Sequence, residues 1–436
     1  MTDLTREPRP QNEPRGGVPP VIDTLDGYRR ACEALARADG PLAADAERAS
    51  GFRYGHDDWL IQFKREGAGI VLLDPMALKA LGADWEGFNQ AVGDAEWIIH
   101  DAMMDLPGFA DIGLRPASLF DTEVAARLLG MHRFGLAAVT EHYLGVILAK
   151  EHSAADWSYR PLPRDWRNYA ALDVELLIEL EALMRADLRA AGKEEWAEEE
   201  FAHVLEEGLQ GGPKREHPVP WLRISRITQL GGDRRALAVA RALWTKRDEL
   251  ARRYDIAPSL LLADSSIIEA ATVKPRNARE FRAVRSLNER VRMRTGGAQD
   301  KMFERYAPIQ RSVKPSVWKA AIQEALALPP SELPTLPSGR GRDGRDEPET
   351  NAPKSMRLWE RHPKRLERLK RVRRAVNQIA EDTRTPAEII VRPQILRNLC
   401  WTDDPACRDV AAFLREQGAR EWQVRLIAAS VSRAIV

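Results

Sequence analysis

The sequence predicts an α/β domain, in which helices flank a mixed sheet, followed by two all-helical domains. All strand-like apolar runs lie before residue 101, and segments with apolar residues at helical spacing follow from residue 121 onward. After Gly212-Pro213 the chain is rich in Arg and Ala and carries few strand signals. A second domain is therefore expected to begin near Pro218.

The elements of the α/β domain are predicted from apolar periodicity. Strands are expected over residues 41–48, 59–63, 70–73 and 97–100, with a turn at Gly67 and Gly69 between the second and the third. Helices are expected over residues 121–130, 135–149 and 166–191. Asp121 and Glu123 fit the start of the first helix, because acidic residues favour the first turn.

Acidic residues on three predicted elements can face one site. In Leu42-Ala-Ala-Asp-Ala-Glu47 apolar and acidic residues alternate, so that Asp45 and Glu47 share one face of a strand. Tyr169 and Asp173 are four residues apart in a helix and also share a face. Asp105 opens the polar turn after the strand at 97–100, at the mouth of the sheet.

This grouping indicates chemistry at phosphorus. Carboxylates brought together repel one another unless cations neutralise them, and ligand sets made only of oxygen suit Mg²⁺ or Mn²⁺. Two such ions about 4 Å apart can clamp an in-line displacement at a phosphodiester. A neighbouring tyrosine can hold the attacking water by a hydrogen bond. We therefore predict phosphodiester hydrolysis with two divalent cations, Mg²⁺ or Mn²⁺, as cofactors.

Each of these motifs taken alone has an ordinary structural explanation. An Asp-x-Glu pair is commonly a solvated strand face, and Tyr-x-x-x-Asp is commonly a pair on a helix surface. Asp105 could cap a helix that begins at Leu106. The joint occurrence of the motifs in one order favours the catalytic interpretation. A zinc site is not expected, since His100, His132 and His142 have no Cys or His partners at zinc spacing.

In order and in flanking sequence, these motifs resemble those of the DEDDy branch of 3′–5′ exonucleases, and of the ribonuclease D family in particular. The resembling segments are Asp45-Ala-Glu47 followed by Tyr54 and Trp59-Leu-Ile-Gln62, His100-Asp-Ala-Met-Met-Asp105-Leu106, Phe120-Asp-Thr-Glu-Val-Ala-Ala-Arg-Leu-Leu-Gly130, Ser153, Asp156-Trp157, Arg160-Pro-Leu162 and Tyr169-Ala-Ala-Leu-Asp173. The resemblance is dense over residues 22 to 200. One departure is Ala46, where the family commonly has threonine.

The resemblance implies an RNase H-like fold for an exonuclease domain over residues 21–205, and trimming of RNA 3′ ends, above all those of tRNA precursors, with release of nucleoside 5′-monophosphates. It implies that Asp45, Glu47 and Asp173 bind one metal and that Asp45 bridges to the second. Asp105 would act at the edge of the cluster, partly through water, and Tyr169 would orient the attacking water. Asp101 could also be argued as the second-motif acid, but the Asp-Leu context favours Asp105.

The helical half resembles HRDC domains, which are small helical bundles. The segment from Ala251 to Ala270 looks like the core of one, within an expected domain over residues 218–300. Pro386 to Leu399 aligns with Pro258 to Ala271 at an offset of 128, which predicts a second HRDC-like domain over residues 356–436. Residues 326–355 are rich in Pro, Gly and charge and are expected to be a linker, and residues 1–20 a disordered tail.

The overall charge says little about a partner, because 66 Lys and Arg balance 65 Asp and Glu. Its distribution says more: residues 274–294 hold eight basic residues and two Glu, and residues 357–374 hold nine and two. Such faces can attract RNA, although charged helix faces are often merely solvated. The candidate substrate-binding residues are Lys274, Arg276, Arg365 and Arg368.

The sequence also indicates the cellular location and the partners of the protein. Three cysteines form no disulfide framework, and no signal peptide or membrane span is evident, which predicts a cytoplasmic protein. RNA is the expected partner, with no membrane and no obligate protein partner. Two alternatives stay open: a DNA-directed 3′–5′ exonuclease of the same fold, and a noncatalytic RNA-binding adaptor on an exonuclease scaffold.

Overall fold

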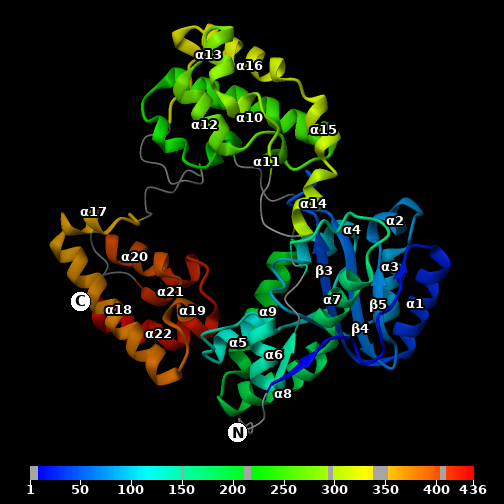
Figure 1. Cartoon of the computed structure of the whole chain (residues 1–436). Helices are drawn as coiled ribbons and strands as arrows, with labels where there is room; N and C mark the ends of the chain where they lie inside the picture. The colour runs from blue at the N-terminus through cyan, green and yellow to red at the C-terminus, as the bar shows by residue number, and fades with distance from the viewer. Residues whose placement is uncertain are drawn as a thin grey trace.

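The computed structural model describes residues 8–148, 152, 154–210, 218–292, 298–336, 352–402 and 409–436. Figure 1 shows three lobes, which we call the α/β domain (residues 8–210), the first bundle (218–336) and the second bundle (352–436). Among the described residues, no helix combines the length and the apolar character needed to cross a membrane. Cys32 and Cys400 are free thiols, as expected, and Cys407 and Ser153 lie outside the described residues.

A six-stranded mixed sheet forms the centre of the α/β domain, as the sequence predicts, with the order β2-β5-β4-β3-β6-β7. The strands are β2 (Val21–Ile22), β3 (Asp39–Arg48), β4 (Asp58–Glu66), β5 (Gly69–Leu73), β6 (Glu96–Ile99) and β7 (Ser118–Asp121). β3 pairs antiparallel with β4 and parallel with β6, so it is hydrogen-bonded along both edges.

Helices cover both faces of this sheet. One face packs against α1 (Leu25–Arg37), α2 (Pro75–Ala80), α3 (Trp85–Val92) and α4 (Leu106–Ile112). The other packs against α5 (Thr122–Leu128), α6 (Leu136–Leu144), α7 (Arg164–Glu175) and α8 (Leu177–Ala190). α9 (Glu194–Leu209) lies against the edge strand β7.

The alternation of side chains along β3 decides which face carries the acids. Leu42 and Ala44 enter the core under α1 and α3, whereas Ala43 enters the core on the opposite face. Asp45 and Glu47 continue the face of Ala43 and therefore point toward α7 and α8.

Two predicted helices differ from the observed ones. The helix expected over 135–149 ends at Leu144, because Gly145 adopts the left-handed conformation (φ 61°), and a short strand β8 (Val146–Leu148) follows. The helix expected over 166–191 is divided into α7 and α8 at Leu176. At this break Lys64 donates a hydrogen bond to the carbonyl oxygen of Glu175, as cations often do at the end of a helix.

The expectation of a disordered tail over residues 1–20 is wrong for residues 8–20. Arg9–Gln11 form a strand, β1, which pairs in parallel with β8. Farther along, Glu13 forms an ion pair with Arg164 at the start of α7. Backbone pairing and ion pairs order this apolar-poor segment, and composition does not reveal them. Residues 1–7 lie outside the described residues.

The first bundle is built around two long helices, α10 (Arg234–Tyr254) and α16 (Pro315–Ala327). Its shorter helices are α11 (Pro258–Leu261), α12 (Asp264–Val273), α13 (Ala278–Ala283), α14 (Ala298–Glu304) and α15 (Ala307–Ser312), with 3-10 turns at Pro220–Arg223, Ile227–Leu230, Arg285–Leu287 and Pro330–Glu332. Leu333 and Leu336 pack against its core, so the bundle continues past residue 300 into the segment expected to be a linker. Residues 337–351 of that segment lie outside the described residues.

The second bundle repeats part of the first. Its helices are α17 (Met356–Glu360), α18 (Pro363–Thr383), α19 (Ala387–Ile390), α20 (Pro393–Trp401), α21 (Val410–Glu416) and α22 (Glu421–Ile435). α10 and α18 each have 21 residues, end at a left-handed residue, and are followed by a four-residue helix.

The register of this repeat differs by one residue from the expected one. The left-handed residues Asp255 and Arg384 correspond, which is an offset of 129 (384 − 255) and not 128. The expected alignment matched Pro258 with Pro386. In the structure Pro258 is the first residue of α11 and Pro386 is the N-cap of α19. Neither position needs a backbone N–H for the helix, so proline fits both.

The second bundle docks on α5 and α9, and Figure 1 shows α19 beside α5. Trp422 stacks on Trp196 of α9, with 4.7 Å between ring centroids, and its indole N–H donates to Glu200 at 2.8 Å. The backbones of the two domains come close together at Gly130, where a Cβ would lie 2.3 Å from the carbonyl oxygen of Arg384. Gly130 is also left-handed, with φ 80°.

We predict that Gly130→Ala loosens the second bundle from the α/β domain, because the added methyl group would overlap the Arg384 carbonyl oxygen. Limited proteolysis and small-angle scattering should detect faster cleavage and a larger radius of gyration. Gly192→Ala is the matched control, since Gly192 has a φ of 66° but no atom within 4 Å of the position that an added methyl group would take. If both variants loosened the second bundle equally, backbone strain and not the contact with Arg384 would be the cause.

Candidate active site

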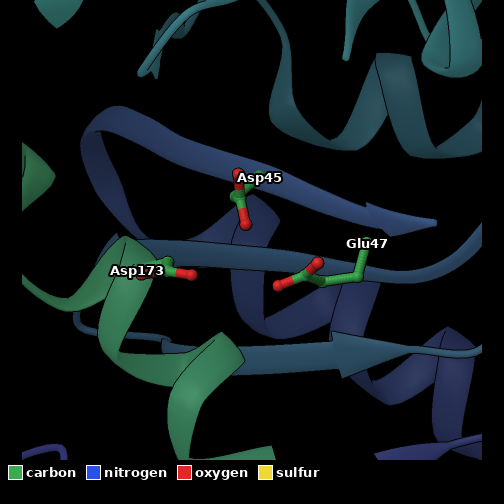
Figure 2. A group of neighbouring side chains, drawn as sticks. All are labelled: Asp45, Glu47 and Asp173. Carbon is green, nitrogen blue, oxygen red and sulfur yellow. The ribbon is translucent and has the colours of Figure 1, made fainter. Parts of the chain in front are cut away.

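Three carboxylates converge beside β3. One carboxylate oxygen from each of Asp45, Glu47 and Asp173 lies within 4.8 Å of the other two. Figure 2 shows the three groups pointing toward one another, two from the strand and one from α7. Each residue is partly exposed to solvent. The structure thus brings together the strand pair and the helix acid that the sequence singled out.

Asp105 does not belong to the group within 4.8 Å, but it is close enough for the charge of Asp45 to raise its pKa. It stands at the N-cap position of α4, but its side chain makes no capping hydrogen bond. Instead it accepts a hydrogen bond from Arg48 at 3.0 Å, and Arg48 also forms an ion pair with Asp58 at 2.9 Å. Asp105 is 4% exposed. Asp105 thus occupies the N-cap position that the structural explanation predicts, but its carboxylate binds Arg48 and not the helix.

The competing acid, Asp101, has other partners. The backbone N–H of Asp101 is bound by the carboxylate of Asp121, which caps α5 as the sequence predicts. The side chain of Asp101 interacts with Glu123, and this contact helps to raise the pKa of Glu123 to about 7, after the larger effect of burial. His100 bonds to Thr122 at 2.8 Å, and burial lowers the pKa of its imidazole to about 4. The geometry therefore favours Asp105 over Asp101.

Tyr169 lies one helical turn before Asp173 on α7. Its ring packs against Trp157, with 6.3 Å between centroids. Burial, reinforced by the negative charge of Asp173, raises the pKa of the Tyr169 hydroxyl. The hydroxyl therefore stays protonated at neutral pH and can donate a hydrogen bond.

The four acids make one another difficult to ionise. Burial is the largest cause that raises the pKa values of Asp45, Glu47 and Asp105 well above their ordinary range. Repulsion between like charges adds to this effect. The negative charge of Asp173 raises the pKa of Asp45, and the negative charge of Asp45 raises the pKa values of Glu47 and Asp105. Burial also raises the pKa of Asp173 to about 7, although a hydrogen bond with Tyr169 opposes it.

A divalent cation fits this arrangement better than protons alone. The donor set consists of carboxylate oxygens, which are the ligands that hard cations prefer. Asp45, Glu47 and Asp173 are close enough to share one ion, and Asp105 is near enough to Asp45 for their charges to interact. A cation would relieve the repulsion that raises the pKa values.

Two supporting residues were not identified as functional from sequence. Gln62 of β4 is fully buried and donates from its amide to Asp45 at 3.1 Å, which fixes that carboxylate. Arg48 follows Glu47, and a register shift between β3 and β4 at this point places Arg48 opposite Asp58. Gln62 had a signal, since it stands in the strand motif of the resembling family. Arg48 had none, because an irregularity in strand pairing is not visible in sequence.

The candidate substrate-binding residues lie outside this cluster. Lys274 forms an ion pair with Asp233 at 2.6 Å, and Arg368 donates to the carbonyl oxygens of Cys400 and Thr402 at 3.1 Å each. These two side chains hold their own bundles together. The guanidinium of Arg365 stacks on Trp401, and Arg276 is exposed. A role of any of the four in RNA binding stays a prediction.

Three segments of the chain match known protein families. Residues 19–189 match a family described as 3′–5′ exonuclease, and residues 236–298 match the HRDC domain. Residues 352–435 match a separate family, the 3′ to 5′ exonuclease C-terminal domain. The acids of β3, α4 and α7 all fall within the first match.

Individual proteins of known structure or curated function are also similar to this chain. A crystal structure of a protein from Bifidobacterium adolescentis is 67% identical, has a TM-score of 0.92, and covers 98% of this chain and 100% of its own. Ribonuclease D of Pseudomonas paraeruginosa is 30% identical over 63% of this chain and 70% of its own length. Ribonuclease D of Escherichia coli shares the fold, with a TM-score of 0.58 at 21% identity over 95% of this chain and 98% of its own. Among other curated relatives, the ribonuclease D proteins of a Shewanella strain and a Jannaschia strain are matched over 56% and 79% of their length.

We predict that divalent cations stabilise the protein more at pH 8 than at pH 6. Because the folded-state pKa values of these carboxylates are raised, the metal-free fold loses stability as pH rises from the ordinary carboxylate pKa near 4 through about 7. A cation must displace the protons, so deprotonation of Asp173 alone should make Mn²⁺ binding about tenfold tighter at pH 8 than at pH 6.

Thermal unfolding with Mn²⁺ and with EDTA at both pH values measures this effect. Asp45→Asn, which removes one charge from the cluster, should abolish most of the difference. A shift of the unfolding temperature that is independent of pH, or equal in the variant, would contradict binding at these carboxylates.

Proposed function

The chain belongs to the ribonuclease D family of 3′–5′ exoribonucleases, and on that premise we propose that it trims the 3′ ends of tRNA precursors and other structured RNAs. The observation that carries the proposal is the convergence of Asp45, Glu47 and Asp173 within 4.8 Å, with Asp105 and Tyr169 beside them. The related protein from Escherichia coli is described as an exoribonuclease involved in structured RNA processing.

The cofactors of this proposal are two divalent cations, Mg²⁺ or Mn²⁺. Asp45, Glu47 and Asp173 would hold one of them, and Asp45 and Asp105 would hold the other. When bound, the pair would neutralise the acidic cluster and stabilise the charge that develops on the phosphodiester oxygens. The raised carboxylate pKa values and the all-oxygen donor set support this assignment.

The side chains of the protein position the reactants. Tyr169 donates its hydroxyl hydrogen to the attacking water, or accepts from it, and so aligns the water with the terminal phosphodiester. Gln62 keeps the carboxylate of Asp45 in one orientation, and Arg48 does the same for Asp105. The water forms a new bond to phosphorus, the 3′ oxygen of the preceding nucleotide leaves and gains a proton, and a nucleoside 5′-monophosphate is released.

We assign RNA and not DNA as the substrate because the family acts on RNA. The acids themselves require only a phosphodiester, which both polymers contain. Discrimination depends on contacts to the 2′-hydroxyl. A noncatalytic RNA-binding role is less well supported, because all five predicted residues are present, three of the acids lie within 4.8 Å of one another, and charges of the cluster act on Asp105 and Tyr169.

We predict that the protein shortens a 5′-labelled RNA from its 3′ end in Mg²⁺ or Mn²⁺ and leaves a DNA strand of the same sequence largely intact. EDTA and Asp45→Asn should each abolish the ladder, because both remove metal from the cluster. Equal or faster trimming of DNA would move the protein to the DNA-directed class. RNA binding without any cleavage would favour the adaptor alternative.

A further inference from the structure

The carboxylate of Asp156 joins the α/β domain to the first bundle. Asp156 precedes α7 in the chain and is completely buried. One of its oxygens accepts a hydrogen bond from Ser158 at 2.6 Å. The other accepts from Arg305 at 2.8 Å and from the Tyr306 hydroxyl at 3.0 Å, and both of these donors belong to the first bundle.

The residue after Asp156 reaches the candidate active site. Trp157 is fully buried and packs against Trp166 and Tyr169 of α7, at centroid distances of 5.5 and 6.3 Å. Met302 of α14 packs against the same apolar cluster. A short path of direct contacts therefore runs from Arg305 and Tyr306, through Asp156 and Trp157, to the tyrosine beside the acids.

The first bundle also holds the loop between the two strands that carry the site. Phe52, in the connection from β3 to β4, is buried in the core of the bundle and stacks on Phe303 at 4.6 Å. Its carbonyl oxygen accepts from the backbone N–H of Ala257 at 2.8 Å. Arg53 donates to Ser158 at 2.9 Å and forms an ion pair with Asp255 at 3.0 Å. The loop after Glu47 and the segment before α7 are thus fixed to one another and to the bundle.

Burial makes this junction depend on the docked bundle. Arg305 and Tyr306 donate hydrogen bonds to one oxygen of the Asp156 carboxylate, and Ser158 donates to the other. A buried carboxylate with fewer donors is less stable, so loss of the Arg305 and Tyr306 donors favours a shift of Asp156 and the adjoining Trp157 from their observed positions. A displacement of about 1 Å at a reacting group can cost about 100-fold in rate. Figure 1 shows α14 at this junction, between the body of the first bundle and the α/β domain.

We propose that the first bundle is a positioning element of the nuclease site, and that Asp156, Arg305 and Tyr306 are positioning residues that act on Tyr169 through Trp157. The inference rests on the proposed function, because it assumes that Tyr169 takes part in hydrolysis. It gives the bundle a role that is separate from any contact with RNA.

The test is a double-mutant cycle in the full-length protein. Arg305→Ala and Tyr306→Phe are each made in the wild-type chain and in a Tyr169→Phe chain. Hydrolysis of a 5′-labelled single-stranded RNA of only a few nucleotides is followed in saturating Mn²⁺, so that contacts of long RNA with the bundles contribute little. Arg235→Ala is the matched control, because Arg235 donates to the carbonyl oxygens of Leu326 and Leu328 inside the same bundle and does not belong to the junction.

We expect the variants at the junction to lower kcat while KM stays nearly unchanged. Arg305→Ala should lower kcat about 10- to 100-fold and leave KM within about twofold, whereas Arg235→Ala should leave kcat unchanged. In the Tyr169→Phe chain the same Arg305→Ala change should cost less than about threefold, because the group that it positions is already absent. Tyr306→Phe removes a single hydroxyl and should show the same pattern to a smaller degree in a chain that still folds.

Other outcomes would overturn the inference. These are an unchanged kcat in folded variants, a loss of equal size in the Tyr169→Phe chain, an effect confined to KM, or an equal loss in Arg235→Ala. A wild-type protein that does not trim RNA would overturn the proposed function together with this inference. An active wild type with insensitive variants would overturn the inference alone.

Discussion

Mutual repulsion among four carboxylates is the constraint on which the rest of this structure depends. Asp45, Glu47, Asp105 and Asp173 come from three separate elements, and burial together with like charge raises the pKa of each. A fold gains nothing from such a group by itself, because like charges held together in a poorly solvated site are destabilising. The cluster offers the carboxylate oxygens that divalent cations prefer, and the surrounding structure keeps it assembled at a cost in stability.

The scaffold meets this constraint by holding each acid from a different direction. The central position of β3 fixes the backbone of Asp45 and Glu47 through pairing on both edges. Gln62 and Arg48 fix individual carboxylates. The N-terminal segment holds the start of α7 through the ion pair between Glu13 and Arg164, and the first bundle holds the preceding segment through Asp156. The first bundle therefore contacts the segments that adjoin the site, in addition to being a candidate RNA-binding surface.

Sequence reasoning predicted the parts of this site that depend on local periodicity. Alternation along β3 placed Asp45 and Glu47 on one face, and helical spacing placed Tyr169 beside Asp173, because these relations involve only near neighbours in the chain. It failed where long-range contacts decide. The pairing of β1 with β8 and the hydrogen bonds of Asp156 to the first bundle join residues more than 130 positions apart, and neither leaves a pattern in sequence. The one-residue error in the bundle repeat arose because proline fits two adjacent helix positions.

The most direct test of the central claim is anomalous diffraction from crystals that contain Mn²⁺ and a short, hydrolysis-resistant RNA. We expect two manganese peaks about 4 Å apart. One should be bound by Asp45, Glu47 and Asp173, and the other should lie between Asp45 and Asp105, with the RNA 3′ end beside Tyr169. No manganese at these carboxylates, or an RNA 3′ end held elsewhere on the protein, would contradict two-metal hydrolysis at this site.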